Sequence, residues 1–147
     1  MELAILGLGC FWGPEIKFSK LNGIIKTEVG YCGGHSAKTN YKEVCSGTTN
    51  HAEVVKLDFD PKVISYEEVI KYFFEIHNPT TLNSQGPDFG TQYRSEIFYL
   101  NDTQKNIAEK LTEKENIKLS GKVVTKISLV KNYCPAEEYH QRYLEKR

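Results

Sequence analysis

Apolar residues recur along the chain with two spacings, and each spacing predicts one kind of element. Short apolar or alternating runs are typical of strands, and they occupy residues 3–8, 24–31, 52–59, 95–100 and 123–130. Residues 66–77 repeat apolar side chains at helical spacing, and shorter or more polar helices are expected at 15–21, 102–115 and 135–146. Strands and helices are therefore mixed along the chain.

Capping residues mark where three of these helices begin. Ser65, with Glu68 three residues on, forms a capping box before the most apolar helix. Asn101 or Asp102 is the expected N-cap of the following helix. Pro135 suits the first turn of the last helix, because its missing N–H would be unpaired there.

Two polar connections are too long to be ordinary turns. Residues 35–51 are irregular in pattern, and residues 80–94 form a loop of a length that is usually functional or disordered. Such connections argue against a doubly wound parallel sheet. The order of elements predicts an α+β fold, a two-layer sandwich of one mixed β-sheet covered by helices, in a single domain over residues 1–147.

Composition excludes several classes of partner. Nineteen basic and nineteen acidic residues balance to zero formal charge, so the footprint of a nucleic-acid-binding protein is missing. No apolar stretch approaches the roughly 20 residues that span a membrane, and a strand from Leu3 leaves no room for a signal peptide. The four cysteines contain no CxxC pair, which favours reduced thiols in the cytoplasm over a disulfide framework.

Cys10 is the first candidate for chemistry. It lies between an apolar strand and a helix start marked by Pro14, where unpaired N–H groups would lower its pKa and make it reactive. Phe11 and the chain's only tryptophan, Trp12, would supply an apolar wall beside it. The alternatives are a small buried thiol and two ordinary core aromatics.

Glu53 is the second candidate. Strand alternation places it on one face with Val55 and Leu57. If that face is buried, the pKa of Glu53 is raised, and a protonated carboxyl can donate a hydrogen bond. The alternative is an edge-strand glutamate in water.

Tyr41 and Tyr93 are phenols on or beside polar loops, and half-buried packing is the ordinary role of such residues. Asp88, between a proline and a phenylalanine, is by default a turn residue.

The remaining motifs are weak. A Gly-x-Gly at residues 7–9 lacks the third glycine of a dinucleotide site, and Cys32-x-x-His35 lacks the second pair of a zinc site.

His51 and His140 could act as bases, but no serine lies in a nucleophile elbow to be activated by them.

Six segments together, in this order, resemble the peptide methionine sulfoxide reductases of the A type. The segments are GCFWGPE at 9–15, GYxGG at 30–34, YKEVCSG at 41–47, HAEVV at 51–55, DFGTQYRS at 88–95 and PAEEYHQ at 135–141. The resemblance spans nearly the whole chain and implies a ferredoxin-like core.

The resemblance implies reduction of the S epimer of methionine sulfoxide, free or in proteins. Cys10 would attack the sulfoxide sulfur and be left as a sulfenic acid. Glu53 would protonate or polarise the sulfoxide oxygen, because that oxygen leaves poorly without a proton. Tyr41 and Tyr93 would hydrogen-bond the same oxygen.

Substrate binding would fall to three other residues. Phe11 and Trp12 would hold the S-methyl group, and Asp88 would position the substrate and nearby water. The chemistry needs no metal and no cofactor, because the electrons come from the thiol. Neither nucleic acid nor a membrane is an expected partner.

Regeneration of Cys10 needs a second thiol. Many members of the family carry resolving cysteines in a C-terminal extension, and this chain ends at Arg147 without one. Cys134 and Cys32 are the internal candidates, and Cys45 is expected to be buried and structural. Otherwise thioredoxin, glutaredoxin or glutathione would attack the sulfenic acid directly.

Two other classes use the same residues. A peroxide-reducing thiol sensor would be oxidised at Cys10 without turning over methionine sulfoxide. A module that only recognises oxidised methionine would keep the aromatic residues and bind without Cys10.

Overall fold

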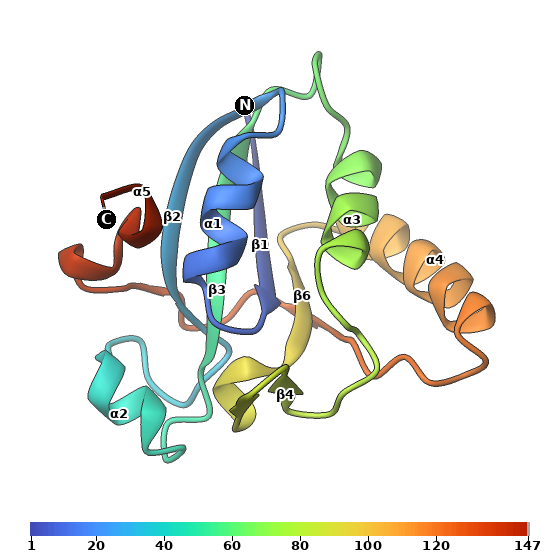
Figure 1. Ribbon diagram of the computed structural model, residues 1–147. Coiled ribbons are helices and arrows are strands. Elements are labelled where there is room, and N and C mark those ends of the chain that lie inside the picture. The colour runs from blue at the N-terminus through green and yellow to red at the C-terminus, as the bar shows by residue number, and fades with distance from the viewer. Residues whose placement is uncertain (147) are drawn as a thin grey trace.

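The computed structural model describes residues 1–146 and contains one six-stranded mixed sheet with helices packed on it (Figure 1). The strand order is β7-β6-β1-β3-β2-β8; β6 and β7 are parallel, and the other paired strands are antiparallel. The strands are β1 (Glu2–Leu8), β2 (Ile24–Cys32), β3 (Ala52–Phe59), β6 (Ser95–Tyr99), β7 (Lys126–Leu129) and β8 (Cys134–Pro135). The helices are α1 (Trp12–Ser19), α2 (Tyr41–Cys45), α3 (Tyr66–Glu75), α4 (Asp102–Lys118) and α5 (Tyr143–Lys146).

The two faces of the sheet bury different apolar clusters, because successive side chains of a strand point to opposite faces. Val55 and Leu57 of β3 join the larger cluster, which α1 and α3 cover. Val54, the residue before Val55, joins a smaller cluster on the other face with Phe98 of β6 and Cys32 of β2. The strand predicted at residues 52–59 therefore buries side chains on both faces.

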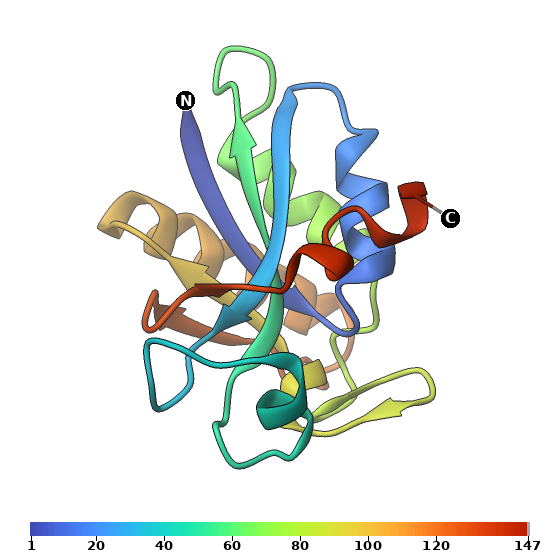
Figure 2. The same cartoon turned by 90° about the vertical axis from the view of Figure 1, so that its left-hand side faces the viewer.

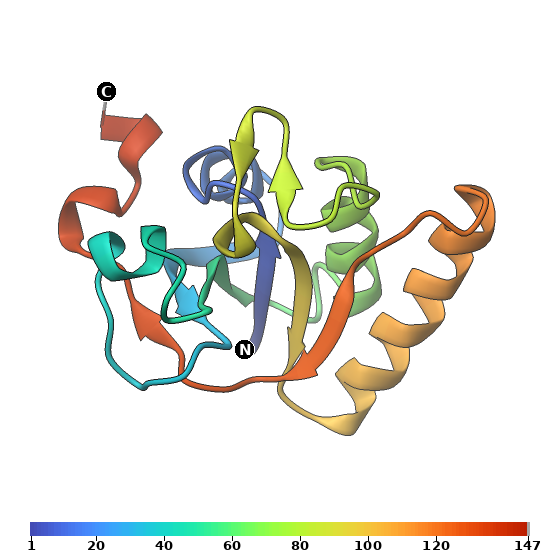
Figure 3. The same cartoon turned by 90° about the horizontal axis from the view of Figure 1, so that it is seen from below.

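A short segment draws the two edges of the sheet together. β7 and β8 are the outermost strands, and a flat sheet would separate them by about 24 Å. Residues 130–133 join the two strands and reach at most about 18 Å. The sheet must therefore curl, and Figure 3 shows the segment running from one edge of the sheet to the other. Val130 and Tyr133 of this segment pack against the smaller cluster.

Several predicted helix starts are confirmed. Ser65 and Glu68 form a complete capping box, and the Asn101 side chain caps α4 by accepting the N–H of Gln104 at 2.9 Å. α1 begins at Trp12, three residues before the predicted start. Between residues 1 and 146, none of the helices is long and apolar enough to cross a membrane.

The long helix predicted over residues 135–146 is wrong. Residues 134–135 form strand β8, a 3-10 turn covers Glu138–His140, and only Tyr143–Lys146 is α-helical. Distant hydrogen bonds outweigh the local helical preference. Gln141 accepts from the N–H of Val29 and donates to its carbonyl, both at 2.9 Å, and Glu15 accepts the N–H of Arg142 at 2.7 Å.

The two long connections contain short elements. Within residues 35–51, Asn40 caps α2 by accepting the N–H of Glu43 at 2.9 Å. An asparagine three residues before a glutamate is a helix-start signal present in the sequence. The loop at 80–94 folds into a hairpin of β4 (Ser84–Gln85) and β5 (Asp88–Phe89), followed by a 3-10 turn, η1 (Thr91–Tyr93).

Candidate active site

Cys10 lies in the turn between β1 and α1, as its flanking residues predict. Gly9 before it has a φ of +96° and lies under the hairpin; a Cβ there would come within 2.8 Å of the Gln85 side chain. Glycine is therefore required at this position. The same close approach brings β4 and β5, with Asp88, over the Cys10 turn.

The expected low pKa of Cys10 is wrong for this state of the protein. Burial raises the pKa of the Cys10 thiol to about 11, and the charges of Glu53 and Asp88 raise it further, against a hydrogen bond from the N–H of Trp12. The helix start contributes as predicted but is outweighed, because desolvation and two nearby carboxyls disfavour a thiolate. Cys10 therefore rests as a thiol.

Glu53 is buried, with 1% of its surface exposed. One carboxyl oxygen accepts the N–H of Phe11 at 3.3 Å, and the other has no hydrogen-bond partner among the described residues. Burial raises the pKa of Glu53 to about 8, with a further contribution from Asp88. At neutral pH Glu53 keeps its proton, as the buried interpretation of the strand predicted.

Tyr41 and Tyr93 meet although they lie on different elements. Tyr41 is the first residue of α2 and Tyr93 the last of η1, and these two elements lie side by side (Figure 2). The Tyr41 side chain interacts electrostatically with those of Tyr93 and Cys45. Burial raises the pKa of Tyr93 to about 12, with the charge of Glu53 the next cause. Both phenols are therefore neutral donors beside the buried carboxyl.

The two aromatic residues after Cys10 occupy different depths. Phe11 is 1% exposed and packs with Tyr31, whose ring centre is 5.8 Å away. Trp12 is half-buried; its ring stacks on Tyr143 at 3.9 Å, and its indole N–H donates to His140 at 3.1 Å. Phe11 thus lies behind the site, whereas Trp12 is held at its surface.

His140 is a site residue that the sequence reasoning considered only as a base. It is 1% exposed, and its ring lies within 6 Å of the rings of Phe11, Trp12, Tyr41 and Tyr139. Burial lowers its pKa, so it is neutral and able to accept the Trp12 N–H. The available signal was its position in the segment PAEEYHQ. That segment lies far from the other site segments along the chain but close to them in the folded protein.

The remaining cysteines lie in three different settings. Cys32 is fully buried in the smaller cluster, so the sheet separates it from Glu53. Cys134 is half-buried on edge strand β8, with its sulfur 3.7 Å from the Thr39 carbonyl oxygen. Cys45, expected to be buried, is exposed at the end of α2, because Val44 is the residue that this short helix turns inward.

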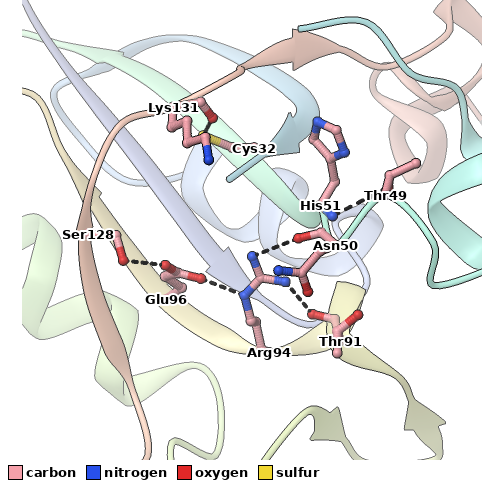
Figure 4. Close-up of polar contacts among 9 residues, drawn as sticks. All are labelled: Cys32, Thr49, Asn50, His51, Thr91, Arg94, Glu96, Ser128 and Lys131. Atoms are coloured by element: carbon pink, nitrogen blue, oxygen red, sulfur yellow. Dashed lines mark hydrogen bonds and ion pairs between the residues drawn. The ribbon is translucent and has the colours of Figure 1, made fainter. Parts of the chain in front are cut away.

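A buried ion pair holds the connections that carry the site (Figure 4). The guanidinium of Arg94 binds Glu96 at 2.5 Å and donates to the carbonyls of Asn50 at 3.1 Å and Thr91 at 2.8 Å. Ser128 donates to the other Glu96 oxygen at 2.6 Å. The start of β3 and the η1 turn are thereby tied together.

The arrangement defines a thiol-based oxidoreductase site, with a neutral buried acid and two phenol donors beside one cysteine. Within residues 1–146, no group of three or more His, Cys, Asp or Glu side chains is placed to hold a metal ion.

The profile of the family described as "Peptide methionine sulfoxide reductase" matches residues 2–147. The chain is 79% identical to the "Peptide methionine sulfoxide reductase MsrA" of Pelagibacter ubique over the full length of both. The chain belongs to the peptide methionine sulfoxide reductase family, in agreement with its six sequence segments.

Solved structures of Mxr1 from Saccharomyces cerevisiae are also similar. The reduced form superposes with a TM-score of 0.95 at 44% identity, covering 99% of this chain and 85% of that one. The form in complex with Trx2 gives a TM-score of 0.69 at 30% identity, covering 97% and 84%.

Proposed function

We propose that the chain reduces methionine-S-sulfoxide, free or in proteins, with Cys10 as nucleophile and Glu53 as acid. Cys10 attacks the sulfoxide sulfur, the oxygen passes to Cys10 as a sulfenic acid, and methionine is released. The thiol is oxidised by two electrons and the sulfoxide is reduced by two, so no other electron source enters this step. The observation that carries the proposal is the protonated Glu53 carboxyl beside the Cys10 turn, one oxygen of which has no hydrogen-bond partner within residues 1–146.

Each neighbouring side chain has a role in this proposal. Glu53 gives its proton to the sulfoxide oxygen as charge develops there, and Tyr41 and Tyr93 donate hydrogen bonds to the same oxygen. Trp12 presents an apolar ring to the S-methyl group, with Phe11 packed behind. Their order of burial supports this division.

Asp88 would position substrate and water from the hairpin over Gly9. Its charge reaches the site, because it raises the pKa of both Cys10 and Glu53.

The raised pKa of Cys10 also bears on the rival functions. A peroxide-reducing sensor needs a cysteine that is already a thiolate in the resting protein, whereas Cys10 rests as a protonated thiol. In the proposed reaction the sulfoxide oxygen takes up a proton while the sulfur is attacked, so a neutral resting site is an advantage.

The proposal also includes a cellular compartment and a reductant. We place the enzyme in the cytoplasm, because four free cysteines suit a reducing compartment. A thioredoxin is the reductant we favour over glutaredoxin or glutathione, since a related Mxr1 was solved with Trx2.

Residues 1–147 would form one catalytic domain with a two-layer, ferredoxin-like core. The central order β6-β1-β3-β2 supports this description, because β1-α1-β2 and β3-α3-β6 are two split βαβ units in that order.

The test is turnover of the two sulfoxide epimers of an N-blocked methionine, with dithiothreitol as reductant and chromatographic detection of the thioether. We expect the protein to reduce the S epimer, Cys10→Ser to be inactive, and the matched cysteine variant Cys134→Ser to stay active. Peroxide oxidation of Cys10 without turnover, or sulfoxide binding without turnover, would each refute the proposal.

A further inference from the structure

Cys45 ends α2 on the helix face that carries Tyr41. Residues four apart on an α-helix lie on the same face, and the Tyr41 ring lies 4.6 Å from the ring of His140. His140 in turn contacts Phe11 and Trp12, the two residues after Cys10. The face of α2 that holds Cys45 is therefore turned toward the Cys10 turn.

Cys45 interacts electrostatically with the two phenols of the site. Its side chain acts on those of both Tyr41 and Tyr93. Cys45 is also close enough to Cys10 for its charge to act on the Cys10 thiol. A second thiol thus lies next to the groups assigned to the sulfoxide oxygen, which is the oxygen that Cys10 carries after methionine leaves.

The other cysteines lack this placement. Cys32 points to the opposite face of the sheet, where its thiol donates to the Lys131 carbonyl at 3.3 Å. Cys134 lies on edge strand β8, against the Thr39 carbonyl. Cys45 is exposed, unlike either of them, and can be reached by an external reductant.

We propose that Cys45 is the resolving cysteine of this enzyme. This proposal rests on the function proposed above. The step begins after methionine has left, when Cys10 is a sulfenic acid. The Cys45 sulfur attacks Sγ of Cys10, an S–S bond forms, the S–O bond breaks, and the hydroxyl leaves as water with the Cys45 thiol proton. Cys45 is oxidised and the sulfenic sulfur reduced, so the step balances without another reactant.

Tyr41 is placed to assist, since it lies four residues before Cys45 on the same face of α2 and its side chain interacts with that of Cys45. An external dithiol, of the thioredoxin class, then exchanges with the disulfide and restores both thiols.

The setting of α2 allows the approach that a disulfide needs, with Cα atoms within about 7 Å. α2 has only five residues, and it is anchored by buried Val44 and by the Tyr41 N–H, which donates to Glu137 at 2.9 Å. Exposed Gly47 follows it with a φ of +79° and open space around its Cα. The exposed Cys45 side chain can therefore change rotamer while Val44 keeps α2 in place.

The experiment is a single turnover of the full chain without reductant, using one equivalent of a methionine-S-sulfoxide derivative. Methionine release, intact mass and disulfide-linked peptides are measured for the wild type, Cys45→Ser and the matched variant Cys134→Ser. We expect one methionine per Cys10 in all three proteins. Wild type and Cys134→Ser should become two hydrogen atoms lighter, with a Cys10–Cys45 linkage, whereas Cys45→Ser should gain one oxygen and react with dimedone.

Steady-state assays give a second readout. Cys45→Ser should lose turnover supported by thioredoxin relative to turnover supported by dithiothreitol, and Cys134→Ser should keep the wild-type ratio. A wild type that gains an oxygen, or a disulfide that survives in Cys45→Ser, would overturn the assignment of Cys45. Failure of the wild type to release methionine would instead overturn the proposed function.

Discussion

Two glutamates are buried on opposite faces of the same sheet, and the fold gives them different partners. Glu96 is 3% exposed, and both of its oxygens are bonded, one to the Arg94 guanidinium and the other to Ser128. Glu53 is 1% exposed; one oxygen accepts a long hydrogen bond from a backbone N–H, and the other has no partner in the described part of the chain.

The difference separates a structural carboxylate from a reactive one. A buried charge is tolerated when it is paired and hydrogen-bonded, as Glu96 is, and the pair then ties chain segments together. A carboxyl without such partners is more stable with its proton, and it can give that proton to a substrate. The face with the paired Glu96 therefore holds the connections, whereas the face with Glu53 carries the chemistry that we propose.

The largest effect is expected from removing the acid. Glu53→Ala should lower kcat/KM for the S-sulfoxide by about 10²–10⁴-fold, the usual contribution of a positioned general acid. Glu53→Gln should lose less, because a neutral amide still donates a hydrogen bond to the oxygen. Both are measured with dithiothreitol as reductant, with thermal unfolding as the control for folding. Equal rates in the wild type and both variants would remove Glu53 from the acid role.

The next effect is on stability, from breaking the pair on the other face. Glu96→Ala leaves Arg94, which is 7% exposed, buried without its counter-charge, and should lower the free energy of unfolding by about 3–5 kcal/mol. Urea denaturation measures it. The milder variant Ser128→Ala, which removes one hydrogen bond to Glu96, should cost about 1–3 kcal/mol. If Glu96→Ala were as stable as the wild type, the two glutamates would not differ as described.

The smallest effect is on the pH profile. The reactive form carries a thiolate on Cys10, whose pKa is about 11, and a proton on Glu53, whose pKa is about 8. Above pH 8 the gain in thiolate is cancelled by loss of the Glu53 proton, so kcat/KM should rise to about pH 8 and then level off. Glu53→Gln has no proton to lose, and its kcat/KM should continue rising about tenfold per pH unit.

Stability measured against pH gives an independent check of this pKa. Glu53 holds its proton more tightly in the folded than in the unfolded chain, so the wild type should lose stability as pH rises from about 4.5 through about 8. Glu53→Gln should lack this loss. A kinetic profile that levels off identically in both proteins would assign the pH 8 transition to another group.

Local pattern was enough for much of the fold. Four of the predicted strands match observed strands to within a few residues, and the Ser65 capping box is present as expected. These elements succeed because their apolar spacing and caps agree with their tertiary contacts. The last predicted helix fails because Gln141 and Glu15 bind backbone groups more than a hundred residues away from their own positions.

The site divides in the same way. The position of Cys10 before a helix and the burial of Glu53 follow from short segments. The pKa of Cys10 does not, because it depends on Glu53 and Asp88, which reach it through pairing of β3 with β1 and packing of the hairpin on Gly9. Nor does the exposure of Cys45, which depends on α2 turning Val44 inward instead.

By itself, the amino-acid sequence determined the longer strands and most of the longer helices, the family, and the residue types available for thiol chemistry. Only the tertiary structure decided that Cys10 rests protonated, that one oxygen of Glu53 has no partner among the described residues while both oxygens of Glu96 have one, and that Cys45 faces the phenols. The physical reason is range: spacing and capping act over a few neighbouring residues, whereas desolvation, charge pairing and thiol placement depend on groups brought together from distant parts of the chain.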